Sequence, residues 1–203
     1  MEAQTVTANG GPAARARQSR SATLAIMGVT AAIIAAVAFM VNQPAAGPDG
    51  FTSVTLSGGA TGEAPTVGKQ APDFLATTVA GKTVRLSDFK GKPVWLTFGA
   101  SWCQPCRAEN PDIQAMSEEF TDSDLVVLAI FISEDASAVK DYADRVGLTY
   151  RKVADPDTRI ASEYRIMGIP SHYFIDSSGV LRLMKIGSLD PAAMEAALKG
   201  ILE

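Results

Sequence analysis

The 203-residue sequence is poor in metal-binding side chains, with only two cysteines and one histidine. A structural zinc site takes four ligands, typically two Cys-x-x-Cys pairs or one pair with two histidines. The composition therefore argues against structural zinc. The chain also lacks an internal repeat, a twin-arginine pair and a lipid-acceptor cysteine near its start, because Cys103 is its first cysteine.

Positive charge is scarce as well. The chain has 18 basic and 22 acidic residues, and residues 1–41 hold three of the basic and one of the acidic ones. The remainder then carries 15 basic and 21 acidic residues, a net charge of −6. Nucleic-acid binding needs a basic face, so the sequence predicts no nucleic-acid partner.

Long uncharged runs are absent except for one, residues 22–41. As a helix this run would be roughly 30 Å long, the thickness of a bilayer core. Arg15, Arg17 and Arg20 precede it, and this predicts a cytoplasmic basic segment 1–21, a transmembrane helix 22–41 and a domain on the extracytoplasmic side of the cell membrane. A cleaved signal peptide is the alternative, since Ala36–Ala38 resembles a cleavage site. The run continues past this point, which favours a retained single-pass anchor.

The next segment is rich in glycine and proline. Residues 42–63 lack a helical period and are predicted to form a flexible linker, with a possible short strand at 51–56. The globular domain is predicted at 64–203. Its apolar runs alternate between strand and helix patterns, including a buried strand at 125–132 and a helix at 136–146 that ends at Gly147. This order predicts an α/β fold with a mixed central sheet flanked by helices.

Both cysteines lie in the stretch FGASWCQPCRAENP, residues 98–111. A disulfide between Cys103 and Cys106 would close a very short loop and stabilise the fold little. The pair follows an apolar strand and opens a predicted helix of residues 103–120, so Cys103 should lie at a helix N-terminus, which favours a thiolate. We therefore expect a redox pair, with Cys103 exposed and attacking and Cys106 more buried and resolving.

In combination, WCQPC, the helix proline Pro111 and GIPSHYFID resemble the thioredoxin fold. The longer version FGASWCQPCRAENP, together with the export segment, resembles the membrane-anchored TlpA/ResA-type thiol–disulfide oxidoreductases. The resemblance covers about residues 64–203. It implies that Cys103 is the nucleophile, Cys106 the resolving cysteine and Trp102 an aromatic beside the site. Pro170 matches the family's cis-proline, and the backbone of Ile169 matches the segment that pairs with substrate. No bound cofactor or metal is implied.

A carboxylate is the third catalytic candidate. Thr97 stands where thioredoxin has a buried aspartate, and the TlpA/ResA-type proteins instead resemble this chain in Glu109. If buried near the thiols, Glu109 could accept the proton of Cys106. The alternative is a solvated acid in the first turns of a helix. His172, the only histidine, departs from the family pattern and is expected to be a neutral core residue without a catalytic role.

The resulting interpretation is an exported protein-disulfide reductase that a membrane electron donor returns to the dithiol. The resemblance suggests apocytochrome c or a copper-site protein as substrate. A disulfide-introducing oxidase and a copper metallochaperone stay open as alternatives. A peroxidase is disfavoured, because Ala100 occupies the position where such relatives have threonine.

Overall fold

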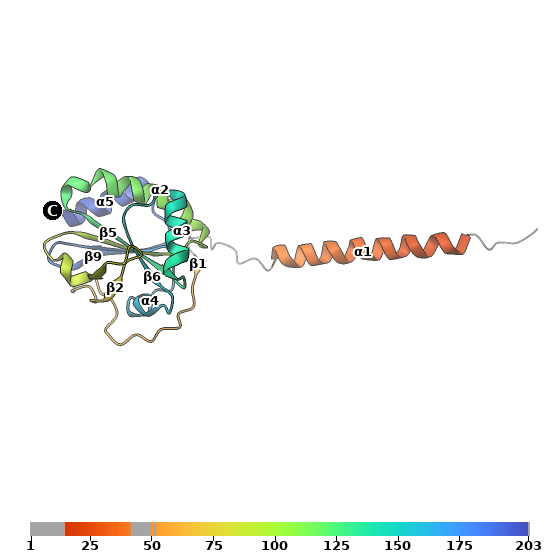
Figure 1. Ribbon diagram of the computed structural model, residues 1–203, viewed down its shortest axis with the longest axis horizontal. Coiled ribbons are helices and arrows are strands. Elements are labelled where there is room, and N and C mark those ends of the chain that lie inside the picture. Colours follow the sequence, from red (N-terminus) through yellow and green to blue (C-terminus); the bar gives the residue numbers. More distant parts are fainter. Residues whose placement is uncertain (1–14, 42–49, 51, 203) are drawn as a thin grey trace, which may run out of the picture. The chain divides into compact units, whose positions relative to one another are not determined.

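The computed structural model describes residues 15–41, 50 and 52–202, in two compact units, Met1–Ala45 and Ala46–Glu203. The first unit contains helix α1 (Arg15–Val41), coloured red to orange in Figure 1. Among the described residues, no helix is both long and apolar enough to cross a membrane. The predicted span at 22–41 includes side chains outside the described ones, so the anchor stays a prediction.

The second unit is built on a five-stranded mixed sheet with the strand order β6-β5-β4-β8-β9. The central strand β4 runs parallel to β5, which runs parallel to β6, whereas β8 and β9 are antiparallel to their neighbours. The strands are β4 (Val94–Gly99), β5 (Val126–Ile132), β6 (Arg151–Asp155), β8 (Ser171–Ile175) and β9 (Leu181–Ile186). The predicted mixed α/β sheet is therefore confirmed.

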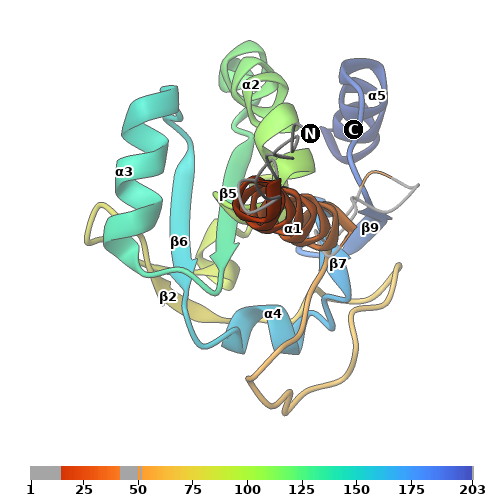
Figure 2. The same cartoon turned by 90° about the vertical axis from the view of Figure 1, so that its right-hand side faces the viewer.

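Helices cover both faces of this sheet, as Figure 2 shows. Three of them, α2 (Gln104–Glu119), α3 (Ala136–Val146) and α5 (Pro191–Leu202), share one apolar cluster with the sheet. On the opposite face, α4 (Arg159–Glu163) and the hairpin of β2 (Leu75–Thr77) and β3 (Thr83–Arg85) contribute to the second cluster. All seven residues of β5 are buried because both of its faces are covered, as its continuous apolar run predicts.

Local sequence signals define where several elements begin and end. The β2–β3 hairpin turns at Gly81, whose φ is +79°. Helix α3 ends at Gly147 with φ +75°, a conformation that glycine adopts without strain. Asp190 accepts a hydrogen bond from the Ala193 N–H at 2.8 Å and caps α5. Two short 3-10 helices, η1 (Leu86–Phe89) and η2 (Thr121–Ser123), complete the connections.

The segment before the domain differs from its prediction. Residues 42–49 and 51 lie outside the described part, but 52–63 lie along the domain and are not a free linker. Strand β1 (Thr52–Ser53) pairs with β7 (Gly168–Ile169), and the Gly62 N–H donates to Glu163 at 3.0 Å. Glycine and proline suggested flexibility, yet the backbone N–H groups of Gly58 and Gly62 find acceptors on the domain. The compact unit accordingly begins at Ala46, well before residue 64.

Candidate functional site

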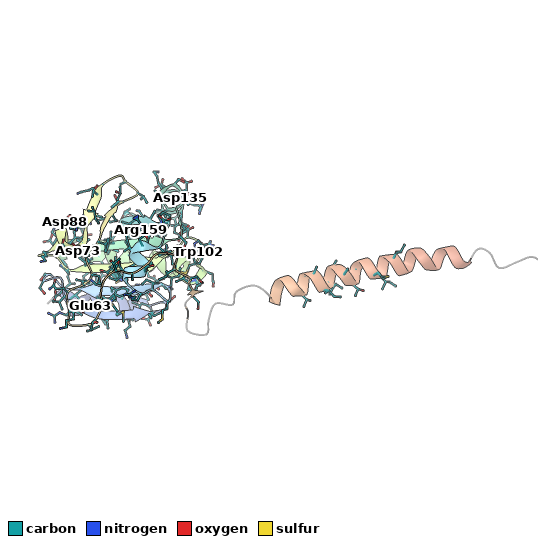
Figure 3. All side chains as sticks on the ribbon, turned by 90° about the horizontal axis from the view of Figure 1, so that it is seen from below. Glu63, Asp73, Asp88, Trp102, Asp135 and Arg159 are labelled. Atoms are coloured by element: carbon teal, nitrogen blue, oxygen red, sulfur yellow. A yellow bond between two sulfur atoms is a disulfide. The ribbon has the colours of Figure 1, made fainter. Side chains whose placement is uncertain are left out.

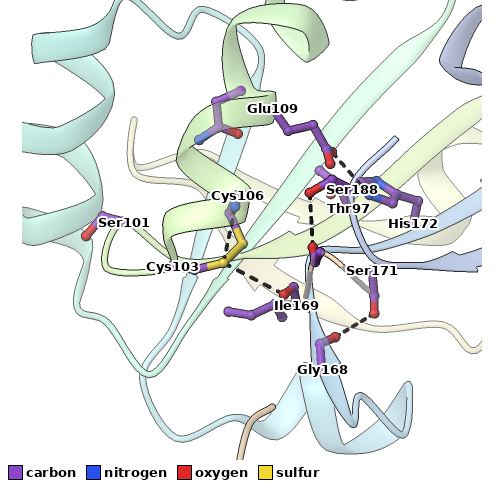
Figure 4. The surroundings of a disulfide bond; sticks show 12 residues. Thr97, Ser101, Cys103, Cys106, Glu109, Gly168, Ile169, Ser171, His172 and Ser188 are labelled. Carbon is purple, nitrogen blue, oxygen red and sulfur yellow. Dashed lines mark hydrogen bonds and ion pairs between the residues drawn. A yellow bond between two sulfur atoms is a disulfide. The ribbon is translucent and has the colours of Figure 1, made fainter. Parts of the chain in front are cut away.

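The two cysteines lie at the end of β4, where the chain enters α2. They form a disulfide, with Cα atoms 5.3 Å apart (Figure 4). Cys103 is the N-cap of α2, and its Sγ accepts a hydrogen bond from the Cys106 N–H at 3.2 Å. The first backbone N–H groups of a helix and its dipole both stabilise negative charge. Once the disulfide is reduced, the same geometry therefore favours a thiolate on Cys103.

The expected difference in exposure between the cysteines is wrong for this oxidised form. Cys103 is 1% exposed and Cys106 is 4% exposed, so neither sulfur faces open solvent. Both belong to the apolar cluster on the α4 face, and Cys103 Sγ lies 3.8 Å from the carbonyl oxygen of Ile169. In contrast Trp102, labelled in Figure 3, is 49% exposed. The residue that precedes Cys103 therefore presents an aromatic ring to solvent.

The loop opposite the disulfide contains Pro170. Its peptide bond with Ile169 is cis, which confirms the prediction. The Ser171 hydroxyl donates to the Gly168 carbonyl at 2.7 Å across this bend. Strand β7, paired with β1, precedes Pro170, and strand β8 of the central sheet follows it, so paired strands position the loop on both sides. The predicted residues Cys103, Cys106, Ile169 and Pro170 are thus brought together.

A second carboxylate supports the cysteine loop from β5. Glu134 follows this strand and is buried, and it accepts hydrogen bonds from both the backbone N–H of Ser101, at 2.7 Å, and the Ser101 hydroxyl. Ser101 immediately precedes Trp102. Glu134 therefore fixes the backbone at the point where the chain leaves the sheet for the active-site turn. Sequence analysis missed this residue, because nothing local to it signals a contact with the cysteine loop.

Glu109 lies inside the domain, one turn after Cys106 on α2. It is 3% exposed, so its interpretation as a solvated acid is wrong. One oxygen, Oε2, accepts a hydrogen bond from the Leu189 N–H at 3.1 Å. The other, Oε1, lies 3.1 Å from His172 Nε2, at ion-pair distance but outside the angles of a well-formed hydrogen bond. Neither Glu109 Oε1 nor His172 Nε2 has another partner among the described residues.

The expectation that His172 is buried is confirmed, with 0% exposure, but its contact with Glu109 was missed. Its other nitrogen, Nδ1, lies 3.3 Å from Trp95 Nε1 and 3.2 Å from the Thr97 hydroxyl. An indole N–H can only donate, so Nδ1 accepts and the ring proton resides on Nε2, facing Glu109. Thr97 and His172 are directly opposed on neighbouring strands, which places Nδ1 beside the Thr97 hydroxyl.

A small cavity lies between Cys106 and the carboxylate of Glu109. Its volume is about 10 Å³, and its walls include Thr97, Cys106, Glu109 and Pro170. This is close to the smallest space that holds one water molecule. Proton transfer between Cys106 and Glu109 through a single water is therefore sterically feasible.

Two buried tyrosines complete the surroundings of Glu109. Tyr150 donates to Asn110 at 3.1 Å, and Asn110 donates to Tyr142 at 2.8 Å. Burial raises the pKa of Tyr150, and the neighbouring Tyr142 and Glu109 add to the effect, so Tyr150 stays neutral. No group of three or more potential metal-ligating side chains occurs in the part of the chain that the structure describes.

Comparison with known families adds to this geometry. The model of the AhpC/TSA family matches residues 67–184, more than half of the chain. The chain belongs to the AhpC/TSA family of thioredoxin-like proteins. It is 37% identical over 133 residues to the thioredoxin-like protein YneN of Bacillus subtilis, covering 64% of this chain and 78% of YneN. It is 32% identical over 135 residues to the thiol–disulfide oxidoreductase ResA of Geobacillus kaustophilus, covering 66% and 78%.

Solved structures of thioredoxin-like proteins share the fold of this AhpC/TSA domain. A thiol:disulfide interchange protein from Chlorobium tepidum has a TM-score of 0.61 at 28% identity, covering 70% of this chain and all of that one. The exposed lipoprotein thioredoxin Etrx1 of Streptococcus pneumoniae has a TM-score of 0.54 at 35% identity, covering 63% and 98%. Together with the Cys103–Cys106 pair, these findings identify a thiol–disulfide oxidoreductase.

Proposed function

We propose that the chain is an exported, membrane-anchored reductase of protein disulfides. The observation that carries the proposal is the position of the Cys103–Cys106 disulfide at the N-terminus of α2, beside the backbone of Ile169 and Pro170. A substrate cysteine bonded to Cys103 would pass this backbone, which offers main-chain hydrogen bonds. The exposed ring of Trp102 supplies an apolar contact for the incoming chain.

The reaction has two exchange steps. In the reduced enzyme the Cys103 thiolate attacks one sulfur of a substrate disulfide, and the other substrate sulfur leaves as a thiolate that takes up a proton. Cys106, once deprotonated, then attacks Cys103 Sγ. This step forms the Cys103–Cys106 disulfide seen in the structure and releases the second substrate thiol. Two electrons and two protons pass to the substrate, and a membrane electron donor restores the dithiol.

Glu109 takes the proton of Cys106 in the second step. The carboxylate and the thiol share the walls of the small cavity, and two N–H groups, from His172 and Leu189, face its two oxygens. A positioned base accelerates proton transfer when it lies within reach directly or through one water. Thr97 is in the same cavity, but its hydroxyl does not ionise at physiological pH.

Reduction is the favoured direction. Gln104 and Pro105, the two residues between the cysteines, carry no positive charge. A cation there would stabilise the thiolate of the reduced form and make the pair a strong oxidant. Without it the disulfide form is favoured, and a favoured disulfide is the property of a reductant. The resemblance to ResA-type proteins points to apocytochrome c or a copper-site protein as substrate.

Helix α1 supports membrane anchoring. Its described side chains, residues 24–37, are exposed, and none is charged. The Thr30 hydroxyl donates to the Ile26 carbonyl at 2.8 Å, so the polar group is satisfied within the helix, as an apolar solvent requires. With Arg15, Arg17 and Arg20 on the cytoplasmic side, the domain would lie outside the cytoplasm.

Covalent trapping tests the proposed function. In Cys106→Ser the mixed disulfide with Cys103 forms but is not resolved, so the substrate should stay bound on non-reducing gels. Cys103→Ser is the matched control and should trap little. Cytochrome c precursors or copper-site proteins in the trapped fraction would support the reductive role. A broad mixture of exported proteins would support an oxidase instead, and equal trapping by both variants would refute the assigned roles.

A further inference from the structure

The backbone edge beside the active-site disulfide is already occupied by the chain itself. In strand β1, Thr52 pairs with Ile169 and Ser53 with Gly168, and the Val54 N–H donates to the Met167 carbonyl at 3.2 Å. Ile169 is the residue whose carbonyl oxygen lies 3.8 Å from Cys103 Sγ. The segment therefore pairs with the main chain that directly contacts the attacking sulfur.

This segment binds the domain as an extended peptide does. From residue 52 to residue 60 half-buried and exposed positions alternate strictly, with the even-numbered residues facing the domain. Such a period of two is typical of an extended chain. Val54 and Leu56 pack against the apolar cluster that includes Cys103, Cys106 and Ile169. Main-chain pairing and alternate side-chain contacts are the two components of strand-addition binding.

Polar contacts with α4 hold the far end of the segment. The N–H groups of Ser57 and Gly58 donate to the Thr158 hydroxyl at 2.8 and 3.1 Å. Those of Thr61 and Gly62 donate to the Glu163 carboxylate at 2.8 and 3.0 Å. None of these contacts involves the cysteine loop, so the far end can be released without touching the site.

We propose that the groove beside β7 is a docking site for an extended peptide, that residues 52–62 are its resident occupant, and that a substrate displaces them. The proposal rests on the proposed function and specifies its substrate class: an unfolded disulfide-bearing segment with apolar side chains two residues apart. When a site is free in only a fraction of molecules, the apparent Kd of its ligand equals the intrinsic Kd divided by that fraction. The resident segment therefore raises the KM for peptide disulfides.

Two adjacent glycines provide a matched pair of variants. A Cβ at Gly58 would lie 2.7 Å from the Thr158 carbonyl oxygen and 2.8 Å from the Ser162 hydroxyl, so Gly58→Ala should release the segment. A Cβ at Gly59 meets nothing within 4 Å, so Gly59→Ala is the control. Neither glycine has a positive φ, so neither change places a side chain in the left-handed region. Glu163→Ala, which removes the acceptor for Thr61 and Gly62, is an independent second release.

The measurements use the full-length chain. Hydrogen exchange of residues 52–62 reports docking, and reduction of a synthetic peptide with one disulfide, with dithiothreitol as electron source, gives KM and kcat. We expect exchange to rise in Gly58→Ala and Glu163→Ala, and the KM to fall at least threefold with kcat unchanged. Gly59→Ala should match the parent in both measurements.

Faster exchange without a lower KM would overturn the proposal, as would a higher KM, because the segment would then be part of the substrate site. Unchanged exchange in both release variants would show that the contacts do not hold the segment, which also overturns it. If the parent chain itself fails to reduce the peptide, the proposed function fails. If the parent chain and the release variants are all active and have the same KM, only the docking proposal fails.

Discussion

The contact between His172 and Glu109 can be tested by removing one partner. His172→Leu places an apolar side chain of similar volume on β8 and deletes both ring nitrogens. Glu109 Oε1 then loses the N–H that faces it at 3.1 Å, and Trp95 loses the acceptor of its indole N–H at 3.3 Å. Since none of these groups is exposed to solvent, water cannot replace the lost partners without a rearrangement of the core.

The size of the effect follows from these two unpaired groups. A buried polar group without a partner costs about 1–3 kcal/mol, with charged groups at the upper end. One carboxylate oxygen and one indole N–H together predict a loss of about 3 kcal/mol in the free energy of unfolding of the oxidised protein. Without the His172 ring, no group on β8 holds Glu109 Oε1 in place. Glu109 would then be positioned less well to take the Cys106 proton, and a tenfold slower resolution step at pH 7 is expected, a modest part of the contribution of a general base.

Stopped-flow kinetics with a chromogenic aryl disulfide separates the two steps. Attack by Cys103 on the dye releases one coloured thiolate, and resolution by Cys106 releases a second. His172→Leu should slow only the second phase, and the difference should shrink at alkaline pH, where Cys106 loses its proton without a base. His172→Gln restores an N–H near the position of Nε2 and should recover most of the rate.

A double-mutant cycle decides between positioning and a merely structural role. In a Glu109→Gln background, His172→Leu should leave the second phase unchanged, because the carboxylate that it positions is gone. A further tenfold loss in that background would refute the reasoning, since His172 would then act on the rate through the packing of β8. An unchanged second phase in Glu109→Gln alone would remove the proton role of Glu109 itself.

Three other predictions follow from single contacts. Trp102→Ala should change the free energy of unfolding by less than about 0.5 kcal/mol, as exposed positions do, yet lower kcat/KM for a peptide disulfide severalfold; equal activity would exclude Trp102 from substrate binding. The Thr61 hydroxyl and the backbone N–H groups of Thr61 and Gly62 lower the pKa of Glu163 from 4.5, so its contribution to docking is present above that value and lost as the pH falls through the lower, folded pKa. The amide NMR shifts of Thr61 and Gly62 should follow this titration, and in Glu163→Gln they should no longer change with pH in this range. The charge of Arg165 also lowers the pKa of Glu163. The intact chain should resist carbonate extraction from membranes, whereas a soluble product that begins near Phe39 would identify a signal peptide.

The sequence was most informative where local pattern and chemistry agree. The apolar run of β5 predicts a strand covered on both faces, and Gly147 and Asp190 predict helix ends, because each signal acts on neighbouring residues. The redox role of the cysteine pair could be predicted equally well, since the pair lies between an apolar strand and a helix and this position defines its environment. Pro170 was identified only in combination with the motif around Cys103.

Other features depend on contacts between distant segments. Glu109 on α2 meets His172 on β8 only because the helix crosses the sheet at that point, and no local pattern encodes the crossing. A short strand at 51–56 was predicted as a possibility, but its partner β7 was not. The glycine-rich composition then suggested a flexible linker. At residue 58, however, glycine is needed for packing, because Thr158 and Ser162 leave no room for a Cβ.

The docking groove and the His172–Glu109 contact meet in five consecutive residues, 168–172. Ile169 pairs with the resident segment on one side of Pro170, and His172 faces Glu109 on the other. Side chains alternate along β8, so Tyr173 packs in the cluster with the cysteines while Phe174 packs in the cluster with α2 and α5. Peptide docking and proton transfer are therefore connected through a short stretch of main chain. A shift of this stretch as a substrate replaces β1 would move His172 relative to Glu109, so the rate of the resolution step should depend on whether the groove holds the resident segment or a peptide.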